Sequence, residues 1–312
     1  MKSFLFAIIL TLMPSATAQV ISEYPIPSRT IAGNICTSPD NLFVYFTANT
    51  TIGRIAMDGS ITEFDVPSAG SNAMKLVGCS FSPKGILYFA DQNNYMIYAF
   101  SPKTKVFVHF PIPGPNVGIA GVQFHSDWLL YIMVSGSSAI HRMQRDGTFL
   151  PVIQLSPGRY PHGPSSCGGN IWFAENMANR VAFVDTAGAV TEFNLPQVAS
   201  EPFSTTCAPD GGVYFTLNAA NQIGRIDTAT YQISTWQIPT PNSEPKGISS
   251  SPTSVCFGES NVNQIGCMPL LGGPITETLV PLRGSSPNKL VSGPDGGVWF
   301  SQANLSYVAR WK

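Results

Sequence analysis

The sequence predicts an all-β fold: a seven-bladed β-propeller of four-stranded blades, closed by an N-terminal strand that completes the last blade. Three observations predict it. A motif recurs at intervals of 39 to 46 residues, each repeat splits into four strand-like runs, and the final repeat lacks one run. The 28 glycines and 26 prolines suit a chain with many turns. We expect one propeller domain over residues 19–312.

The recurring motif is a variant of ITEF-x-VP. It reads VISEYPIP at 20–27, ITEFDVP at 61–67, VTEFNLP at 190–196 and ITETLVP at 275–281. The prolines that end the repeats are Pro27, Pro67, Pro113, Pro157, Pro196, Pro239 and Pro281. A period of this size is typical of solenoids, propellers and arrays.

The repeat at 201–239 shows the internal pattern most clearly. It contains the runs FSTTC, GGVYFTL, QIGRID and ISTWQIP, separated by turn sequences such as PDGG and NAAN. Short runs rich in Val, Ile, Phe, Tyr and Trp between Gly, Asn and Asp are typical of strands. Four such strands per repeat indicate a propeller blade.

The two ends of the chain together supply the four strands of one predicted blade. The residues after Pro281 contain three strand-like runs and no fourth, whereas residues 20–27 form an isolated fourth run. We therefore expect residues 20–26 to pair with residues 306–311, because an open ring would expose two unpaired edges. A linear solenoid would need capping repeats, and none is visible.

Composition limits the function classes. Charged residues make up 11% of the chain and the formal net charge is −1, so electrostatic binding of nucleic acid is not expected.

A signal peptide is predicted over residues 1–18, cut after Ala18. It is indicated by Lys2, the apolar run 4–13 and the small residues 16–18. No other run is long enough to span a membrane. The mature protein is expected to be secreted or to reside in the secretory-pathway lumen.

Secretion makes the six cysteines candidates for disulfides and makes Asn49 and Asn304, in N-x-S/T sequons, candidate glycosylation sites. Equivalent positions in neighbouring blades, or facing positions in one hairpin, select one pairing of the 15 possible for six cysteines. The expected bridges are Cys36–Cys79, Cys167–Cys207 and Cys256–Cys267. The first two require inner strands of adjacent blades to approach within about 7 Å.

The repeats resemble those of the virginiamycin B lyases, the streptogramin lyases. The resemblance rests on PHG…NIWFAEN (161–176), PDGGVYFT (209–216), NQIGRI (221–226) and PDGGVWFS (294–301), and it extends over essentially the whole mature chain. It implies a seven-bladed propeller. It also implies a site at one mouth of the central channel, formed by the first residue of each inner strand and a residue about fourteen positions later.

The residues at the implied catalytic positions depart from the family. The resemblance implies a His and a Glu in the last blade, a His in the blade before, a Tyr in the first blade and a magnesium ion. This chain has Asn288, Gln302, Lys246 and Asn34 at those positions. Asn and Gln take no proton at neutral pH, and Lys is a base only with a strongly lowered pKa. We therefore predict that streptogramin ring opening is absent and that no metal or other cofactor is used.

Other ionisable groups gather at the predicted mouth in blades 4 to 6. The candidate catalytic residues are His162, Lys246, Glu259, Glu175 and Tyr160. The candidate substrate-binding residues are Phe203, Leu217, Glu201, Glu244, Asn288, Gln302 and Asn34. An apolar hollow with a few polar groups is the usual form of a small-molecule site. The structural alternative is that these carboxylates bond backbone amides or that Lys246 pairs with Glu244 or Glu259.

Three functions remain open at this stage. The first is a secondary-metabolite pericyclase that joins a terpene alkene to a tropolone-derived quinone methide. Architecture, secretory signal and loss of the lyase residues resemble the secreted fungal hetero-Diels–Alderases of tropolone sesquiterpenoid pathways. Such a reaction needs two partners held face to face and one or two hydrogen-bond donors.

The second is a carbon–oxygen lyase with a rewired site. The third is a non-catalytic propeller that binds glycans or a protein. The first two imply an apolar small-molecule substrate, and the oligomeric state stays open.

Overall fold

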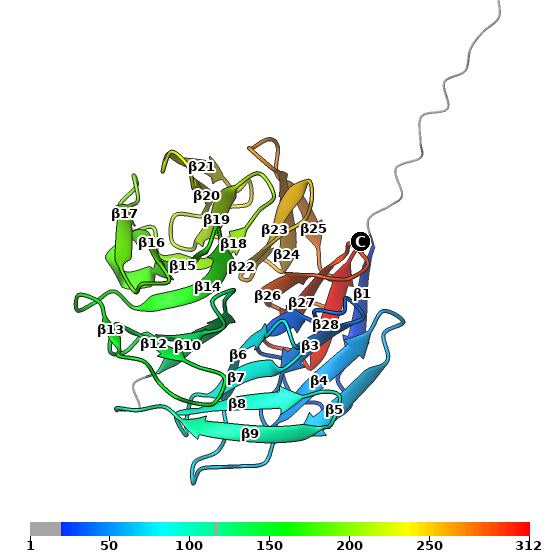
Figure 1. Ribbon diagram of the computed structural model, residues 1–312. Coiled ribbons are helices and arrows are strands. Elements are labelled where there is room, and N and C mark those ends of the chain that lie inside the picture. The colour runs from blue at the N-terminus through cyan, green and yellow to red at the C-terminus, as the bar shows by residue number, and fades with distance from the viewer. Residues whose placement is uncertain (1–19, 116–117) are drawn as a thin grey trace, which may run out of the picture.

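The protein is a ring of seven four-stranded antiparallel sheets around a central channel, in a computed structural model that describes residues 20–115 and 118–312 (Figure 1). The predicted fold is confirmed. The expected signal peptide lies outside the described residues. No helix of the described ranges is long and apolar enough to cross a membrane.

The first three blades follow the chain in order from the channel outward. Blade 1 contains β2 (Ile35–Thr37), β3 (Phe43–Thr47), β4 (Thr51–Ala56) and β5 (Ile61–Asp65). Blade 2 contains β6 (Leu76–Phe81), β7 (Leu87–Asp91), β8 (Met96–Ser101) and β9 (Val106–Pro111). Blade 3 contains β10 (Ile119–Phe124), β11 (Leu130–Val134), β12 (Ala139–Met143) and β13 (Ile153–Gln154).

Blades 4 to 6 repeat this order. Blade 4 contains β14 (Pro161–Cys167), β15 (Asn170–Glu175), the short 3₁₀ helix η1 (Asn176–Ala178), β16 (Arg180–Val184) and β17 (Val190–Asn194). Blade 5 contains β18 (Pro202–Cys207), β19 (Gly212–Leu217), β20 (Gln222–Asp227) and β21 (Ile233–Gln237). Blade 6 contains β22 (Pro245–Ser250), β23 (Ser254–Glu259), β24 (Gln264–Pro269) and β25 (Thr276–Leu279).

The last blade joins the two ends of the chain. It contains β26 (Pro287–Ser292), β27 (Val298–Gln302), β28 (Tyr307–Trp311) and β1 (Ile21–Pro25). Strand β1 pairs with β28 antiparallel, from Ile21 opposite Trp311 to Pro25 opposite Tyr307. The closure expected from the incomplete last repeat is therefore confirmed, and β1 covers the edge of β28 that would otherwise be exposed.

The hydrophobic core is divided among the contacts between adjacent blades. The second strands are buried on both faces, as in β7 and β11, because each blade packs on two neighbours. One cluster, for example, joins Tyr45 and Ile52 of blade 1 to Phe89 and Phe100 of blade 2. Another joins Phe46 of blade 1 to the last blade and so closes the ring.

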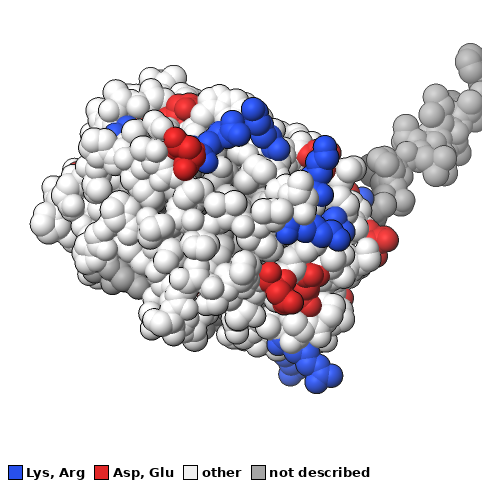
Figure 2. Space-filling view, turned by 60° about the horizontal axis from the view of Figure 1, so that its bottom comes forward, with Lys and Arg blue, Asp and Glu red and all other residues white. Residues whose placement is uncertain are grey.

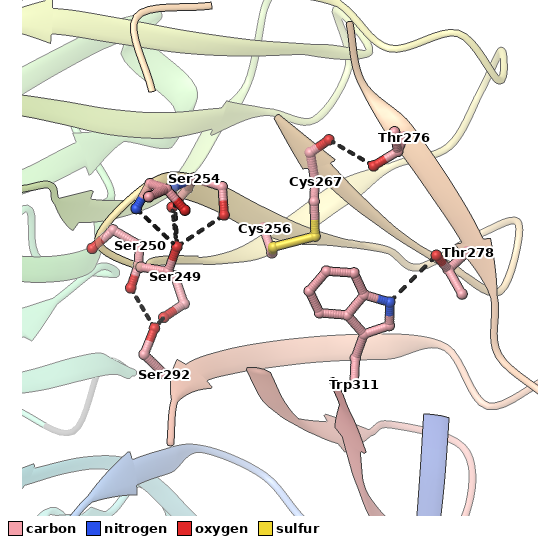
Figure 3. Close-up of a disulfide and its surroundings, with 11 residues drawn as sticks. Ser249, Ser250, Ser254, Cys256, Cys267, Thr276, Thr278, Ser292 and Trp311 are labelled. Atoms are coloured by element: carbon pink, nitrogen blue, oxygen red, sulfur yellow. Dashed lines mark hydrogen bonds between the residues drawn. A yellow bond between two sulfur atoms is a disulfide. The ribbon is translucent and has the colours of Figure 1, made fainter. Parts of the chain in front are cut away.

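Side-chain bonds also link the inner strands of neighbouring blades. Ser165 and Thr205 hydroxyls lie 2.7 Å apart between blades 4 and 5, and Ser249 and Ser292 hydroxyls lie 3.0 Å apart between blades 6 and 7 (Figure 3). Thr37 Oγ1 donates to the Ser292 carbonyl at 2.6 Å, which links the last blade to the first. These bonds satisfy hydroxyls that line a narrow channel.

The three predicted disulfides are present. Cys36–Cys79 joins blades 1 and 2, and Cys167–Cys207 joins blades 4 and 5, with Cα atoms 5.8 and 5.2 Å apart. Cys256–Cys267 spans facing positions of one hairpin in blade 6 (Figure 3). In the chain-entropy model, closing a loop of about 40 residues stabilises the fold by about 4 kcal/mol.

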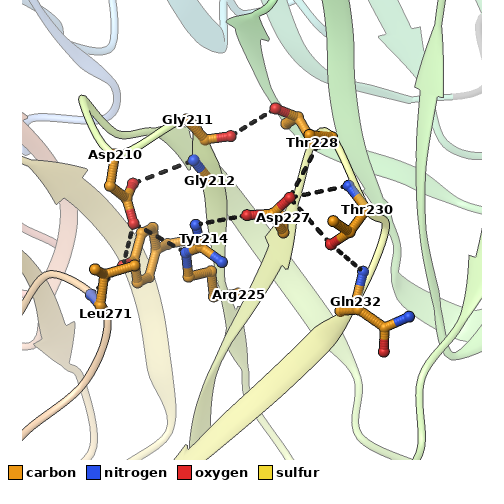
Figure 4. Close-up of polar contacts among 11 residues, drawn as sticks. Asp210, Gly211, Gly212, Tyr214, Arg225, Asp227, Thr228, Thr230, Gln232 and Leu271 are labelled. Atoms are coloured by element: carbon orange, nitrogen blue, oxygen red, sulfur yellow. Dashed lines mark hydrogen bonds and ion pairs between the residues drawn. The ribbon is translucent and has the colours of Figure 1, made fainter.

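A polar network anchors the turn before the second strand of blade 5. Asp210 accepts hydrogen bonds from Tyr214 Oη at 2.9 Å and Arg225 Nε at 2.9 Å, and Tyr214 Oη accepts one from Leu271 N at 2.8 Å (Figure 4). Arg225 also reaches Asp227 at 3.1 Å. The network ties this turn to the third strand of its own blade and to the loop of the next blade.

The surface carries few charges, as the composition predicts. Figure 2 shows isolated blue and red groups on a largely uncharged face. Asn49 and Asn304 are exposed in the hairpin turns before β4 and β28. Glycosylation at both sites stays a prediction.

Candidate functional site

The central channel is a hollow of about 580 Å³ lined by inner strands of all seven blades. Asn34 and Lys289 lie toward the mouth where the inner strands begin, and Thr37 and Ser292 lie toward the other end. None of the described residues that line this hollow is Asp or Glu. Its ionisable chemistry therefore depends on amines and imidazole at the mouth.

A β-bulge at the start of the inner strands shapes this mouth. In β14 the register with β15 shifts between His162 and Ser165, and β26 shows the same shift between Pro287 and Leu290. A bulge breaks the strict alternation of side chains and re-aims the residues within it. Lys289, which lies within the bulge of β26, lines the channel, and the preceding residue does not.

Glycine permits the close approach of neighbouring strands at these bulges. Gly163 has a φ of +53°, and a Cβ there would lie 2.4 Å from the Phe203 carbonyl oxygen. A Cβ on Gly247 would lie 2.1 Å from the Asn288 carbonyl oxygen. Blade 7 has Lys289 at the position that glycine holds in blades 4 and 6.

His162, Phe203 and Lys289 form one cluster across blades 4, 5 and 7. The His162 and Phe203 ring centroids lie 4.2 Å apart, and His162 Nδ1 lies 2.9 Å from the Phe203 carbonyl oxygen. The Lys289 Nζ atom lies 4.6 Å from the Phe203 ring centroid. The phenyl ring is thus shared by an imidazole and a primary amine.

The electrostatics of the cluster favour neutral forms. Burial, with the positive charge of Lys289, lowers the His162 pKa to about 3. Neutral His162 then donates from Nδ1 to the carbonyl and presents Nε2 as an acceptor. Burial, with the charge of Lys246, lowers the Lys289 pKa from 10.5 to about 8. Lys289 therefore has a substantial neutral fraction near physiological pH.

Lys246 and Asn288 complete the polar groups at this mouth. Lys246 Nζ lies 3.8 Å from Glu244 Oε2. Of the two ion-pair partners expected for Lys246, Glu244 and Glu259, the structure shows Glu244. Asn288 Oδ1 is buried and has no hydrogen-bond partner among the described residues. A buried acceptor without a partner costs free energy, which pairing with a ligand donor would remove.

Tyr160, Glu201 and Glu244 lie on the rim. All three have left-handed backbone conformations, with φ of 48°, 50° and 50°. The Tyr160 side chain is exposed, as are those of both glutamates. These residues end the loops that enter the inner strands of blades 4, 5 and 6, so they lie on one side of the mouth.

Glu175 and Glu259 lie inside their blades, fully buried, and face an acid of the outermost strand. Glu175 Oε2 lies 3.2 Å from Arg159 Nε, which also binds Glu192 at 2.8 Å. Burial and the charge of Glu192 raise the Glu175 pKa to about 8, and burial with Glu277 does the same for Glu259. The geometry separates both carboxyls from the channel cluster.

Gln302 and Leu217 occupy the same second-strand position in their blades. Gln302 Nε2 donates to Glu23 Oε1 at 2.7 Å, across to the outermost strand of blade 7. Leu217 packs in the core between blades 4 and 5. The structure thus brings His162 and Phe203 together with Lys289, and the charge of Lys246 acts on Lys289. Asn34 lines the channel in blade 1, and Gln302 and Leu217 lie within the blades.

The magnesium site implied by the resemblance does not fit these residues. No group of three or more His, Cys, Asp or Glu side chains suited to a metal ion occurs in the described part of the chain. At the mouth, the amines of Lys246 and Lys289 would repel a divalent cation, and Gln302 is engaged with Glu23. The residues described at the mouth therefore do not supply a set of ligands for magnesium.

Comparison with known proteins shows the family to which the chain belongs. A family model described as the virginiamycin B lyase family matches residues 71–312. The chain belongs to the virginiamycin B lyase family. Among curated relatives, virginiamycin B lyase of Nocardia farcinica is 32% identical over 88 residues, which span 28% of this chain and 32% of that relative.

Solved structures of this family superpose over nearly the whole ring. A streptogramin B lyase structure has a TM-score of 0.87 at 27% identity and covers 94% of this chain and 97% of its own. Virginiamycin B lyase from Staphylococcus aureus has a TM-score of 0.87 at 24% identity, with 94% and 99% covered. A catalytically inactive histidine-to-alanine variant of the latter, with quinupristin, has a TM-score of 0.86.

Lys289 is the residue that reasoning from the sequence missed. The resemblance drew attention to Asn288, because it aligns with the family's histidine. A signal existed in the repeats: the next position is Gly163 in blade 4, Ser204 in blade 5 and Gly247 in blade 6. A lone lysine at a position otherwise held by small residues indicates a special role.

Proposed function

We propose that this protein is an enzyme that breaks a carbon–oxygen bond of a small molecule by elimination at the channel mouth. The observation that carries the proposal is the Lys289 amine, with a pKa of about 8, against the Phe203 ring and beside the Lys246 cation. A desolvated lysine next to a second cation is an activated base or nucleophile. Membership in a lyase family supports the reaction class.

In the proposed step, neutral Lys289 takes a proton from the carbon next to a carbonyl group. The electron pair of that C–H bond forms a C=C bond, and the C–O bond at the β carbon breaks. The departing oxygen takes a proton from the Lys246 ammonium group, which also stabilises charge on the carbonyl oxygen. His162 Nε2 and Asn288 Oδ1 accept hydrogen bonds from the substrate and orient it.

The substrate proposed is apolar, terpenoid- or polyketide-like, with a carbonyl group and a β oxygen substituent. The Phe203 ring supplies the apolar wall, and the two lysines attract the carbonyl oxygen. The exposed Tyr160 on the rim supplies a further aromatic contact for a ligand that extends beyond the channel. Secretion, proposed from the signal sequence, agrees with three disulfides.

A second candidate is the hetero-Diels–Alder pericyclase. The channel hollow has no acidic lining residue among those described, and a cycloaddition needs no base. Holding the two partners together would lower the barrier by roughly 7–11 kcal/mol. Lys289 and Lys246 would polarise the electron-poor partner, and Phe203 would hold the alkene.

One set of variants separates the two candidates. Purified protein is incubated with β-oxygenated carbonyl compounds, quinupristin among them, and with diene and alkene pairs, and products are identified by mass spectrometry. Lys289→Met and Phe203→Ala are compared with Lys75→Met, which removes an exposed charge at the same end of the ring.

For elimination, Lys289→Met lowers the rate about 10²–10⁴-fold, because a general base is lost. The wild-type rate rises with pH to a plateau above about 8, where the amine is neutral, and Lys75→Met is unchanged. For the pericyclase, Phe203→Ala is the more damaging change and no rise through pH 8 occurs. Elimination that persists in Lys289→Met with an unchanged pH profile overturns the proposal.

A further inference from the structure

A second hollow, of about 550 Å³, opens between blades 1 and 2 at the end of the ring opposite the mouth. It is lined by the turns Ser38–Asp40 and 83–85, by Pro102 and Lys103, and by the strand residues Phe43, Tyr45, Arg54 and Phe81. We refer to it as the blade 1–2 hollow. Nothing in the proposed reaction uses it, and only Pro39 and Phe81 also line the channel.

Arg54 departs from the ion pairing of its counterparts in other blades. In blades 5 and 7, the arginine of the third strand is paired with the aspartate of the turn before the second strand, as Arg225 with Asp210 and Arg310 with Asp295. Arg54 holds the corresponding place in blade 1, where Asp40 is the turn aspartate. Within the described residues, Arg54 makes no ion pair.

The bonds of Asp40 lie within its own turn, and Oδ2, the atom that pairs with arginine in blades 5 and 7, makes no ion pair with Arg54 in the described residues. Its Oδ1 atom accepts hydrogen bonds from Ser38 Oγ at 2.5 Å and Leu42 N at 3.1 Å, both within the turn. The Arg54 guanidinium instead lies over the Phe43 ring at 4.5 Å. It makes a weak side-chain bond to Thr62 Oγ1 at 3.4 Å and interacts with the Tyr45 hydroxyl, which leaves some of its five N–H donors unused.

The remaining lining combines aromatic walls with two more cations. The Tyr45 ring meets Phe81 edge-on at 5.1 Å and Phe43 at 6.4 Å. Lys84 and Lys103 are exposed in the turns and make no ion pair in the described part of the chain, and Lys84 Nζ lies 5.8 Å from the Trp128 ring centroid. Three cations and one carboxylate therefore surround an aromatic hollow, in a protein whose charged residues make up only 11% of the sequence.

We propose that the blade 1–2 hollow binds a planar aromatic carboxylate. The planar guanidinium of Arg54 matches a carboxylate in a two-bond arrangement. Lys84 and Lys103 add attraction from the turns, and the half-buried Phe43 and Phe81 side chains contact the aromatic ring. This site is separate from the proposed reaction at the mouth.

The test uses the full mature protein and 2-naphthoate as the probe, followed by isothermal titration calorimetry. The neutral analogue 2-naphthamide measures the contribution of the carboxylate charge. Arg54→Gln is compared with Arg283→Gln, which removes the same charge from an exposed loop at the other end of the ring. Lys289→Met reports whether the probe enters the channel mouth instead.

The expected result is saturable binding with a Kd below about 1 mM, weakened about tenfold or more by Arg54→Gln because a charge-assisted bond is lost. The amide binds at least about tenfold more weakly, and Arg283→Gln and Lys289→Met have no effect. The proposal is overturned by no binding, by equal binding of acid and amide, or by equal losses in the two arginine variants. Loss only in Lys289→Met would place the probe at the mouth and would also refute the site.

Discussion

Replacing Lys289 by methionine is expected to stabilise the fold at neutral pH while strongly slowing the proposed reaction. Burial and the charge of Lys246 lower the Lys289 pKa from 10.5 to about 8, so the folded state disfavours the ammonium form. The difference of about 2.5 pH units corresponds to about 3 kcal/mol. Methionine has a similar length and no charge to desolvate, so the variant recovers up to this amount.

The pH dependence identifies the cause. Below pH 8 lysine is protonated in both states, and the full destabilisation is present. Between about pH 8 and 10.5 the unfolded state binds more protons than the folded state, so wild-type stability rises with pH relative to the variant. The gain in Lys289→Met is therefore largest near pH 7 and vanishes near pH 10.5.

Urea unfolding of the disulfide-intact protein, followed by tryptophan fluorescence, measures this difference at several pH values. Lys75→Met is the control, because it removes an exposed amine at the same end of the ring. A loss of stability in Lys289→Met at pH 7, or a gain that does not decline toward pH 10.5, refutes the reasoning. Functional residues often reduce stability in this way.

Three further outcomes are expected. Deleting residues 19–27 removes β1, exposes the edge of β28 and causes aggregation; an unchanged melting temperature would contradict ring closure. Glu259→Gln should remain folded and donate to Glu277, as Gln302 does to its own partner. Because the Glu259 pKa is raised to about 8, wild-type stability falls as pH rises from about 4.5 through 8, and the glutamine variant should lose this decline in urea titrations. Non-reducing peptide mapping should recover the three bridges, and six free thiols would contradict them.

Local sequence patterns determined the architecture. The period of the ITEF-x-VP motif, the four runs per repeat and the missing last run predicted seven blades and the pairing of β1 with β28. Repetition makes this possible, because equivalent positions in successive blades occupy equivalent places in the ring. The same equivalence selected the bridges, since Cys36 and Cys79 hold matching inner-strand positions.

Only the tertiary structure decided which side chains meet. Bulges at the inner-strand starts turn Lys289 into the channel beside Phe203, and alternation along a regular strand does not predict this. Glu175 instead faces the outermost strand of its blade, where Glu192 lies, and it pairs with Arg159, which also binds Glu192. Sequence spacing sets the strand on which a residue lies. Bulge geometry and the packing of neighbouring blades set the direction of its side chain, and direction determines whether a residue reaches a substrate.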